Sequence, residues 1–232
     1  MSGSRARLTI LTLCTIPLLG CTGGRGHPPA TGEPSGALAA TSGVSQVAAG
    51  AGARSPRIVP LERMTGDVEI LHGHPDSAGP FVMRIRELPG TIVPPHTHPV
   101  DEHITVVQGT WYFATGERFD STALRAMPAG TYAFAPSGTT MFAASPEGAV
   151  VQVHGIGPFH IHWRDGLRVL DQPGSEGVFR FRKGDEVNTP RGAGRIRQGY
   201  ASGAVIQYEV EGAGGQLFMA SEHEVRRTPA PQ

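Results

Sequence analysis

The sequence predicts an all-β protein, with a closed double-sheet barrel followed by a smaller β-barrel. From Ile58 onward, short runs rich in β-branched and aromatic residues alternate with Gly, Pro and Asp turns at intervals of roughly ten residues, which is typical of barrels and sandwiches. No segment of helical length shows an apolar period near 3.6 residues. Gly (32) and Pro (20) make up more than a fifth of the 232 residues, which indicates a chain rich in turns.

The large barrel is expected over residues 58–164. Short strands with tight turns require an architecture that removes exposed sheet edges, and a closed double-sheet barrel does so. The strands that we expect lie at residues 68–71, 81–88, 91–94, 103–108, 110–114, 123–127, 131–135, 140–143 and 150–155.

A second β-rich segment is expected over residues 178–228, after a linker at 165–177. It is too long for a tail and too short for a second large barrel, and its pattern resembles the small Tudor/KOW-type barrels. Gly-rich turns separate the expected strands, at residues 186–189, 194–198, 205–210 and 216–220.

The N-terminal 57 residues are not expected to join either barrel. Residues 1–20 combine two arginines with an apolar run of twelve residues, 8–19, which is too short to span a bilayer and is typical of a secretory signal. Residues 21–57 are rich in Gly, Ala, Ser, Thr and Pro, and such a stretch cannot bury enough apolar surface to offset its chain entropy. We expect a disordered tether there.

The signal segment ends in Leu18-Leu19-Gly20-Cys21, which resembles the bacterial lipobox. That resemblance implies cleavage before Cys21 and a lipid on its sulfur. The only other cysteine, Cys14, would be lost with the signal, so no internal disulfide can form in the mature chain. We therefore expect a lipid-anchored protein of the cell envelope that faces the periplasm, with the outer membrane as the expected location.

The charges exclude one class of partner. Lys+Arg and Asp+Glu are 20 each, so the formal net charge is zero. A nucleic-acid-binding surface needs an excess of positive charge, and we therefore expect no nucleic-acid partner.

Residues 90–109 read GTIVPPHTHPVDEHITVVQG and hold the strongest candidate site. In a strand, alternate side chains share a face, so His96 and His98 are expected to point the same way. If the chain then reverses, the next strand brings Glu102 beside them. Two imidazoles and a carboxylate inside a barrel favour a divalent transition metal, with Fe, Mn, Zn, Ni and Cu as candidates.

Written as spacings, this stretch is Gly90-x5-His96-x-His98-x3-Glu102-x6-Gly109, and it resembles the first motif of the cupins. A second cupin motif is matched in part, with Gly130, Pro136 and Gly138 in the scaffold positions, Met141 in place of histidine and Ser145 in place of asparagine. The resemblance covers residues 57–164 and points to single-domain bacterial cupins. It implies a double-stranded β-helix, or jelly roll, with a metal held by His96, His98, Glu102 and the residue at position 141.

Met141 leaves three interpretations open. The other three residues can form a two-His, one-carboxylate set of the kind associated with non-haem Fe(II). The Met141 thioether can itself be a soft ligand, which would favour reduced copper. Finally, Met141 can be apolar filling in a barrel whose metal site has weakened or gone. His154 is a further candidate to enter the barrel and replace the missing ligand.

Cupins include dioxygenases, isomerases, decarboxylases and binders without activity, so the resemblance does not settle whether this chain is an enzyme. One hypothesis is a metal-binding oxygenase or isomerase that acts on a small molecule in the barrel. The other is a non-catalytic module that binds or senses a ligand in the envelope, with a weak or absent metal site. No general base is identifiable in the sequence, and the assembly is left open, with a homodimer as one candidate.

Overall fold

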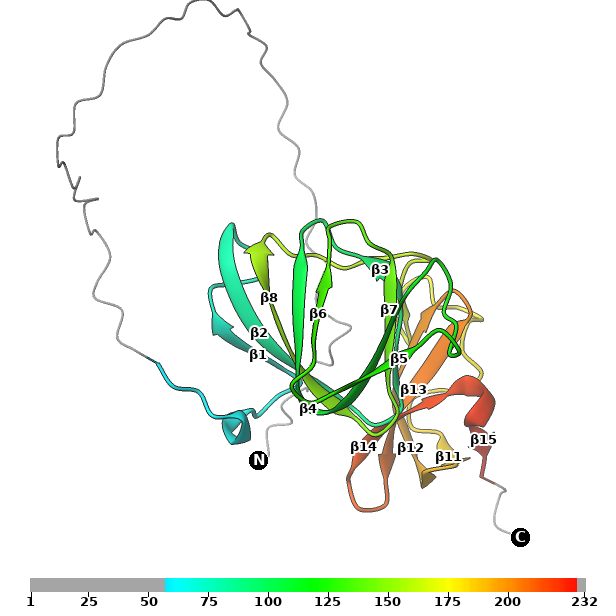
Figure 1. Ribbon diagram of the computed structural model, residues 1–232. Coiled ribbons are helices and arrows are strands. Elements are labelled where there is room, and N and C mark those ends of the chain that lie inside the picture. Colours follow the sequence, from blue (N-terminus) through cyan, green and yellow to red (C-terminus); the bar gives the residue numbers. More distant parts are fainter. Residues whose placement is uncertain (1–56, 229–232) are drawn as a thin grey trace, which may run out of the picture. The chain divides into compact units, whose positions relative to one another are not determined.

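The computed structural model describes residues 57–228; the signal segment, Cys21 and the rest of the expected tether up to residue 56 lie outside this range. Within it, the regular structure is strand apart from two short 3-10 turns, Leu61–Arg63 and Glu222–Glu224 (Figure 1). The prediction of an all-β fold is therefore confirmed. No helix among the described residues has the length and apolar character that crossing a bilayer requires.

The first nine strands form one sheet, in the order β1-β2-β8-β4-β7-β3-β9, with β5 and β6 paired to β4. The sheet curls on itself as a double-stranded β-helix, with β2 and β8 on one wall and β3 and β7 on the other (Figure 1). The strands are β1 (Val68–His72), β2 (Gly79–Glu87), β3 (Thr91–Thr97), β4 (Glu102–Thr115), β5 (Arg125–Pro128), β6 (Tyr132–Ala135), β7 (Met141–Ser145), β8 (Ala149–Gly157) and β9 (His162–Trp163).

Strand β4 belongs to both walls of the barrel. Its first half pairs with β6 and β8, and its second half pairs with β5 and β7. The prediction of two strands, 103–108 and 110–114, was therefore wrong, because the chain bends at Gly109 without leaving the sheet. Gly109 has a φ of +79°, and a Cβ there would lie 2.6 Å from the carbonyl oxygen of Gly148. Only glycine fits this bend.

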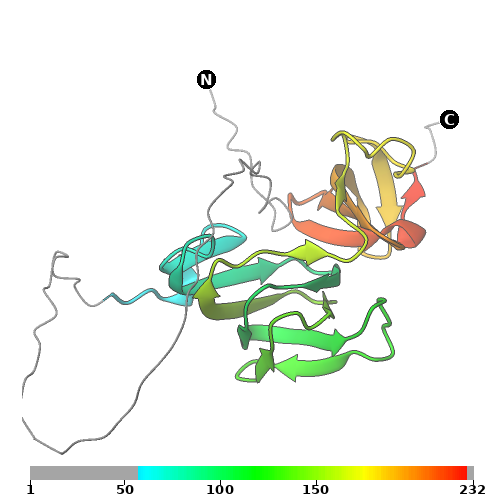
Figure 2. The same cartoon turned by 90° about the horizontal axis from the view of Figure 1, so that it is seen from above.

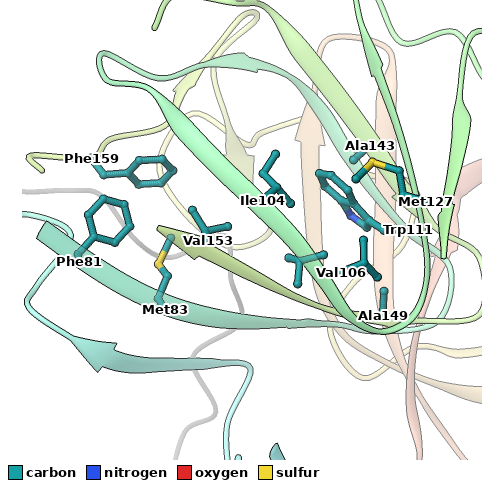
Figure 3. Close-up of a cluster of buried hydrophobic side chains, with 11 residues drawn as sticks. Phe81, Met83, Ile104, Val106, Trp111, Met127, Ala143, Ala149, Val153 and Phe159 are labelled. Atoms are coloured by element: carbon teal, nitrogen blue, oxygen red, sulfur yellow. The ribbon is translucent and has the colours of Figure 1, made fainter. Parts of the chain in front are cut away.

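The interior of the barrel is filled from alternate positions of its strands (Figure 3). Phe81 and Met83 of β2 lie on the same inner face of the sheet as Ile104 and Val106 of β4, and the residues between them in each strand are half-buried. This alternation is the period-2 pattern of a sheet with one face packed against a core. The remaining members of the cluster are Trp111, Met127, Ala143, Ala149, Val151, Val153 and Phe159.

The C-terminal strands form a separate sheet, in the order β14-β13-β12-β11-β15, with β10 paired to β12 (Figure 2). Its strands are β10 (Arg168–Val169), β11 (Glu186–Thr189), β12 (Gly192–Ser202), β13 (Val205–Gly212), β14 (Leu217–Ser221) and β15 (Arg226–Arg227). β10 lies in the segment that the sequence suggests as a linker. The two-residue strands β10 and β15 were not predicted, because two residues are too few to show an alternating pattern.

Tyr208 of β13 is at the centre of the core of the second sheet and is fully buried. Its hydroxyl donates a 2.6 Å hydrogen bond to Glu222 Oε2 and accepts a 3.0 Å hydrogen bond from the backbone N–H of Arg180. Burial, followed by the hydrogen bond to Glu222, raises the pKa of the phenol, so it remains a donor at ordinary pH. The hydroxyl thus satisfies polar groups from two other segments of the chain.

We expect Tyr208→Phe to lower the free energy of unfolding by about 1–3 kcal/mol, because the buried Phe181 N–H and the partly buried Glu222 carboxylate each lose a hydrogen-bond partner. Equilibrium unfolding in urea measures the change. Tyr112→Phe, at a half-buried position of β4, is the matched control and should change stability by less than about 0.5 kcal/mol. Equal effects of the two substitutions would contradict the role given to the Tyr208 hydroxyl.

Candidate metal centre and barrel cavity

The structure buries both histidines of the first motif. His96 lies near the end of β3 and His98 just after it, and their exposed fractions are 7% and 3%. Their ring centroids are 4.9 Å apart, with the planes at 80° to each other. The backbone of His96 pairs with Met141 of β7 and with Trp163 of β9, so β3 is held between these strands. The two rings therefore lie together inside the barrel, against its wall.

Hydrogen bonds fix the tautomer of both rings. His96 Nδ1 lies 2.7 Å from the carbonyl oxygen of Pro94, and His98 Nδ1 lies 2.8 Å from that of His160. A carbonyl oxygen can only accept, so each Nδ1 carries the proton and each Nε2 keeps its lone pair. Metal-ligating histidines are commonly oriented in this way by a second hydrogen bond.

Burial keeps both rings uncharged. It lowers the pKa of His96, and burial together with the neighbouring His96 ring lowers the pKa of His98 to about 3. Near pH 7, both side chains are therefore neutral imidazoles, the form that ligates metals.

Glu102, the first residue of β4, is the carboxylate of this group. Its Oε2 is 3.5 Å from His98 Nε2, and its exposed fraction is 7%. Burial raises the pKa of Glu102 to about 8. A bound cation would reverse this effect, because it favours the charged form of a buried carboxyl group.

Met141, the first residue of β7, is buried at 2% exposure and lines the same cavity as His96, His98 and Glu102. The structure thus brings all four predicted ligands to one cavity. Among residues 57–228, however, no three His, Cys, Asp or Glu side chains are grouped so that they could hold a metal ion as they stand. The four side chains thus line one cavity, but they do not converge on a single point as the ligands of a bound ion would.

His154 does not enter the barrel, which overturns its candidacy as a replacement ligand. It pairs directly with His103 across β8 and β4, and the two rings stack at 4.7 Å between centroids. His103 Nδ1 is 2.7 Å from the hydroxyl of Tyr132, a largely exposed side chain. The pair lies on the outer face of the sheet because Glu102 and Ile104, on either side of His103, point inward.

The cavity has a volume of about 120 Å³, and most of its wall is apolar. The metal-ligand candidates lie in this wall together with a second buried acid, Glu87. The apolar side chains of the wall include Met83, Ile104, Phe113, Phe142, Val151, Val153 and Phe159.

Glu87, the last residue of β2, was missed in the sequence. Its exposed fraction is 6%, and its Oε2 accepts a 3.0 Å hydrogen bond from Trp111 Nε1 and another from the Ser145 hydroxyl. Burial raises the pKa of Glu87 to about 7, against the opposing effect of these two hydrogen bonds. A signal was present, because Glu87 is in phase with Phe81 and Met83, which face the core.

The C-terminal sheet contributes to the same wall through Gln207 and Met219. Gln207 accepts a 3.1 Å hydrogen bond from the N–H of Ile92 and donates a 2.9 Å hydrogen bond to the carbonyl of Gly90. The backbone N–H of Met219 also donates to the carbonyl of Pro89, at 2.7 Å. The second sheet is thus bonded to the start of β3 and to the two residues before it.

No protein-family model matches the sequence, and no curated protein matches it. Solved structures do, at low identity. The DMSP lyase DddQ from Ruegeria pomeroyi DSS-3 is 20% identical with a TM-score of 0.33, and the match covers 39% of this chain and 46% of that one. The chain thus spans less than half the length of the lyase.

Two further similar structures match nearly whole proteins. An RmlC-like cupin protein from Desulfovibrio desulfuricans is 21% identical with a TM-score of 0.37, over 44% of this chain and 97% of that one. An uncharacterized conserved protein with a double-stranded β-helix domain from Klebsiella pneumoniae is 21% identical with a TM-score of 0.36, over 47% and 98%. Similarities at this level carry no argument about activity, which must come from the site itself.

Proposed function

We propose that the barrel binds a small organic molecule beside a divalent transition-metal ion held by His96, His98 and Glu102. The observation that carries the proposal is the tautomer of the two rings, since the bonds to Pro94 and His160 leave both Nε2 atoms unprotonated, the form that binds a metal. The buried Glu102 supplies the negative charge that a cation needs. Since these donors do not form a finished set, we infer that side chains rotate when the ion binds.

When bound, the ion would supply Lewis-acid or oxygen-activating chemistry. The chain's own residues exclude water through the apolar wall and hold the two imidazoles in one orientation. For an enzyme, these features favour an oxygenase or isomerase of a small molecule. Oxygen uptake, or isomerisation of a panel of small phenols and sugars, would identify the reaction.

Elemental analysis of the purified protein tests the metal proposal. After stripping with a chelator and reloading with Fe, Mn, Zn, Ni or Cu in turn, we expect one ion per chain for at least one metal, together with a higher Tm. A protein that takes up none of the five and shows no change in Tm would refute it.

We expect Met141→His to tighten metal binding by at least about tenfold, because an imidazole replaces a thioether beside the proposed ligands. Titration calorimetry with Zn²⁺ measures the change. Met127→His, at another buried methionine position of the same core, is the control and should not tighten binding. If Met141 is itself a ligand, the substitution should also reduce the preference for reduced copper.

A metal-free binding module is the second candidate. It is favoured by the absence of a grouped ligand trio among residues 57–228 and by the apolar wall of the cavity. On this alternative, Met141 is packing and the protein binds a small molecule with no ion present. Ligand binding that is unchanged by chelator would favour it over the metal centre.

We also propose that the protein is anchored in the cell envelope by a lipid on Cys21. The support is the sequence Leu18-Leu19-Gly20-Cys21, which ends the apolar segment. We expect Cys21→Ala to abolish the mass added by the lipid and to release the protein from the membrane fraction. Intact-protein mass spectrometry of both fractions measures this. An unmodified wild-type cysteine would contradict the anchor.

A further inference from the structure

The cavity has a second buried acid away from the candidate metal ligands. His98 stacks on Phe159, with 4.1 Å between ring centroids, whereas Glu87 is bonded to Trp111. Figure 3 shows Phe159 and Trp111 at opposite ends of the core cluster, with Ile104 and Val153 between them. A ligand near Trp111 can therefore meet a polar group that is not one of the candidate metal ligands.

The hydrogen bonds of Glu87 use only one of its two carboxyl oxygens. Both the indole N–H and the Ser145 hydroxyl donate to the same oxygen, Oε2, which leaves Oε1 available to a ligand in the cavity that Glu87 lines. A neutral acceptor such as glutamine would satisfy the same two donors without the cost of burying an ionisable carboxyl group. A carboxyl group has a second oxygen that can accept a further hydrogen bond. This capacity is explained if a ligand supplies a third donor, in addition to Trp111 and Ser145.

The size of the cavity limits that ligand. A cavity of 150 Å³ lined by apolar side chains holds one benzene molecule, and this one is about 120 Å³ with a similar lining. The occupant is thus of the size of one six-membered ring or a short branched chain. Apart from the group that bonds to Glu87, its surface must be mainly apolar.

We propose that Glu87 is a ligand-anchoring residue, whose Oε1 accepts a hydrogen bond from the hydroxyl of a small, mainly apolar molecule about the size of phenol. This deepens the proposed function, because it rests on the barrel binding a small molecule, but it does not require the metal. A buried acceptor built for a hydroxyl discriminates strongly against an analogue that lacks it.

Phenol and toluene are the matched probes, because they differ by a hydroxyl in place of a methyl group. Binding of each to the chelator-stripped protein is measured by titration calorimetry at pH 8, where the Glu87 carboxyl group is mainly ionised and phenol is not. We expect Glu87→Gln to weaken the binding of phenol at least about tenfold and to change the affinity for toluene by less than about twofold. Only phenol loses a hydrogen-bond acceptor in this variant. Glu176→Gln, at an exposed position, is the control and should change neither.

Nuclear Overhauser contacts between phenol and the wild-type protein provide a second test, which can be carried out even if the Glu87→Gln variant does not fold. We expect contacts to the Trp111 indole. Contacts to Phe159 and Trp163 alone, equal losses for both probes in Glu87→Gln, or no binding of phenol would each overturn the proposal. Because the protein is metal-free here, these results are independent of whether it later takes up an ion.

Discussion

Replacing His98 with alanine is expected to reduce metal affinity by more than about 100-fold. Losing a hydrogen-bond partner of a ligand already costs 10–100-fold, and losing one of three ligands should cost more. The Nε2 atom of His98 lies 3.5 Å from Oε2 of Glu102, so these two side chains could bind the same ion. The substitution leaves Glu102 without this second ligand. Titration calorimetry with Zn²⁺ and elemental analysis of the reloaded protein measure the loss.

His103→Ala is the matched control for this experiment. It removes an imidazole from the same barrel, but from the outer face, where His103 contacts Tyr132 and His154. We expect it to leave the metal content unchanged. Circular dichroism and urea unfolding establish that both variants fold. Equal loss of metal in the two variants would place the site on the outer face and contradict the proposed centre.

The second large effect is the pH dependence of stability that arises from Glu87. Because burial raises its pKa from 4.5 to about 7 in the folded state, the folded protein binds this proton more tightly than the unfolded chain does. The contribution to stability is therefore complete below about pH 4.5 and is lost as the pH rises to about 7 and above. The loss amounts to about 3 kcal/mol by pH 8.

Glu87→Gln isolates this contribution, because glutamine keeps the shape and an acceptor for Trp111 but cannot titrate. Urea unfolding of the metal-free proteins is measured from pH 4 to pH 8. We expect the stability of the variant relative to wild type to rise by about 3 kcal/mol across this range. Glu176→Gln should show no such trend. A constant difference between Glu87→Gln and wild type at every pH would show that Glu87 keeps an ordinary pKa.

The fold class and part of the site could be predicted from local patterns. Alternation of apolar residues and the spacing of Gly and Pro turns indicated an all-β barrel, because side chains two residues apart share a face of a strand. The same rule predicted that His96 and His98 lie together, and the structure places their ring centroids 4.9 Å apart. The chain reversal after His98 was enough to predict that Glu102 returns beside them.

Other features depended on pairing between distant segments, which a single strand pattern does not encode. The bend at Gly109 was mistaken for the end of a strand, because a glycine has the same appearance in a turn and in a strand that changes partners. The candidacy of His154 failed for a local reason, because alternation along β8 puts Val151 and Val153 inside the barrel and His154 on the outer face, beside His103.

Local residue patterns were enough to predict the all-β class and the set of residues from which a metal centre could be built. The tautomer of His98, set by the carbonyl of His160, and the partners of Glu87 could not be predicted in this way. A pKa and a protonation state depend on burial and on hydrogen bonds, and here the partners are far apart in the sequence. Trp111 and Ser145 reach Glu87 from 24 and 58 residues away, and such bonds exist only once the barrel has closed.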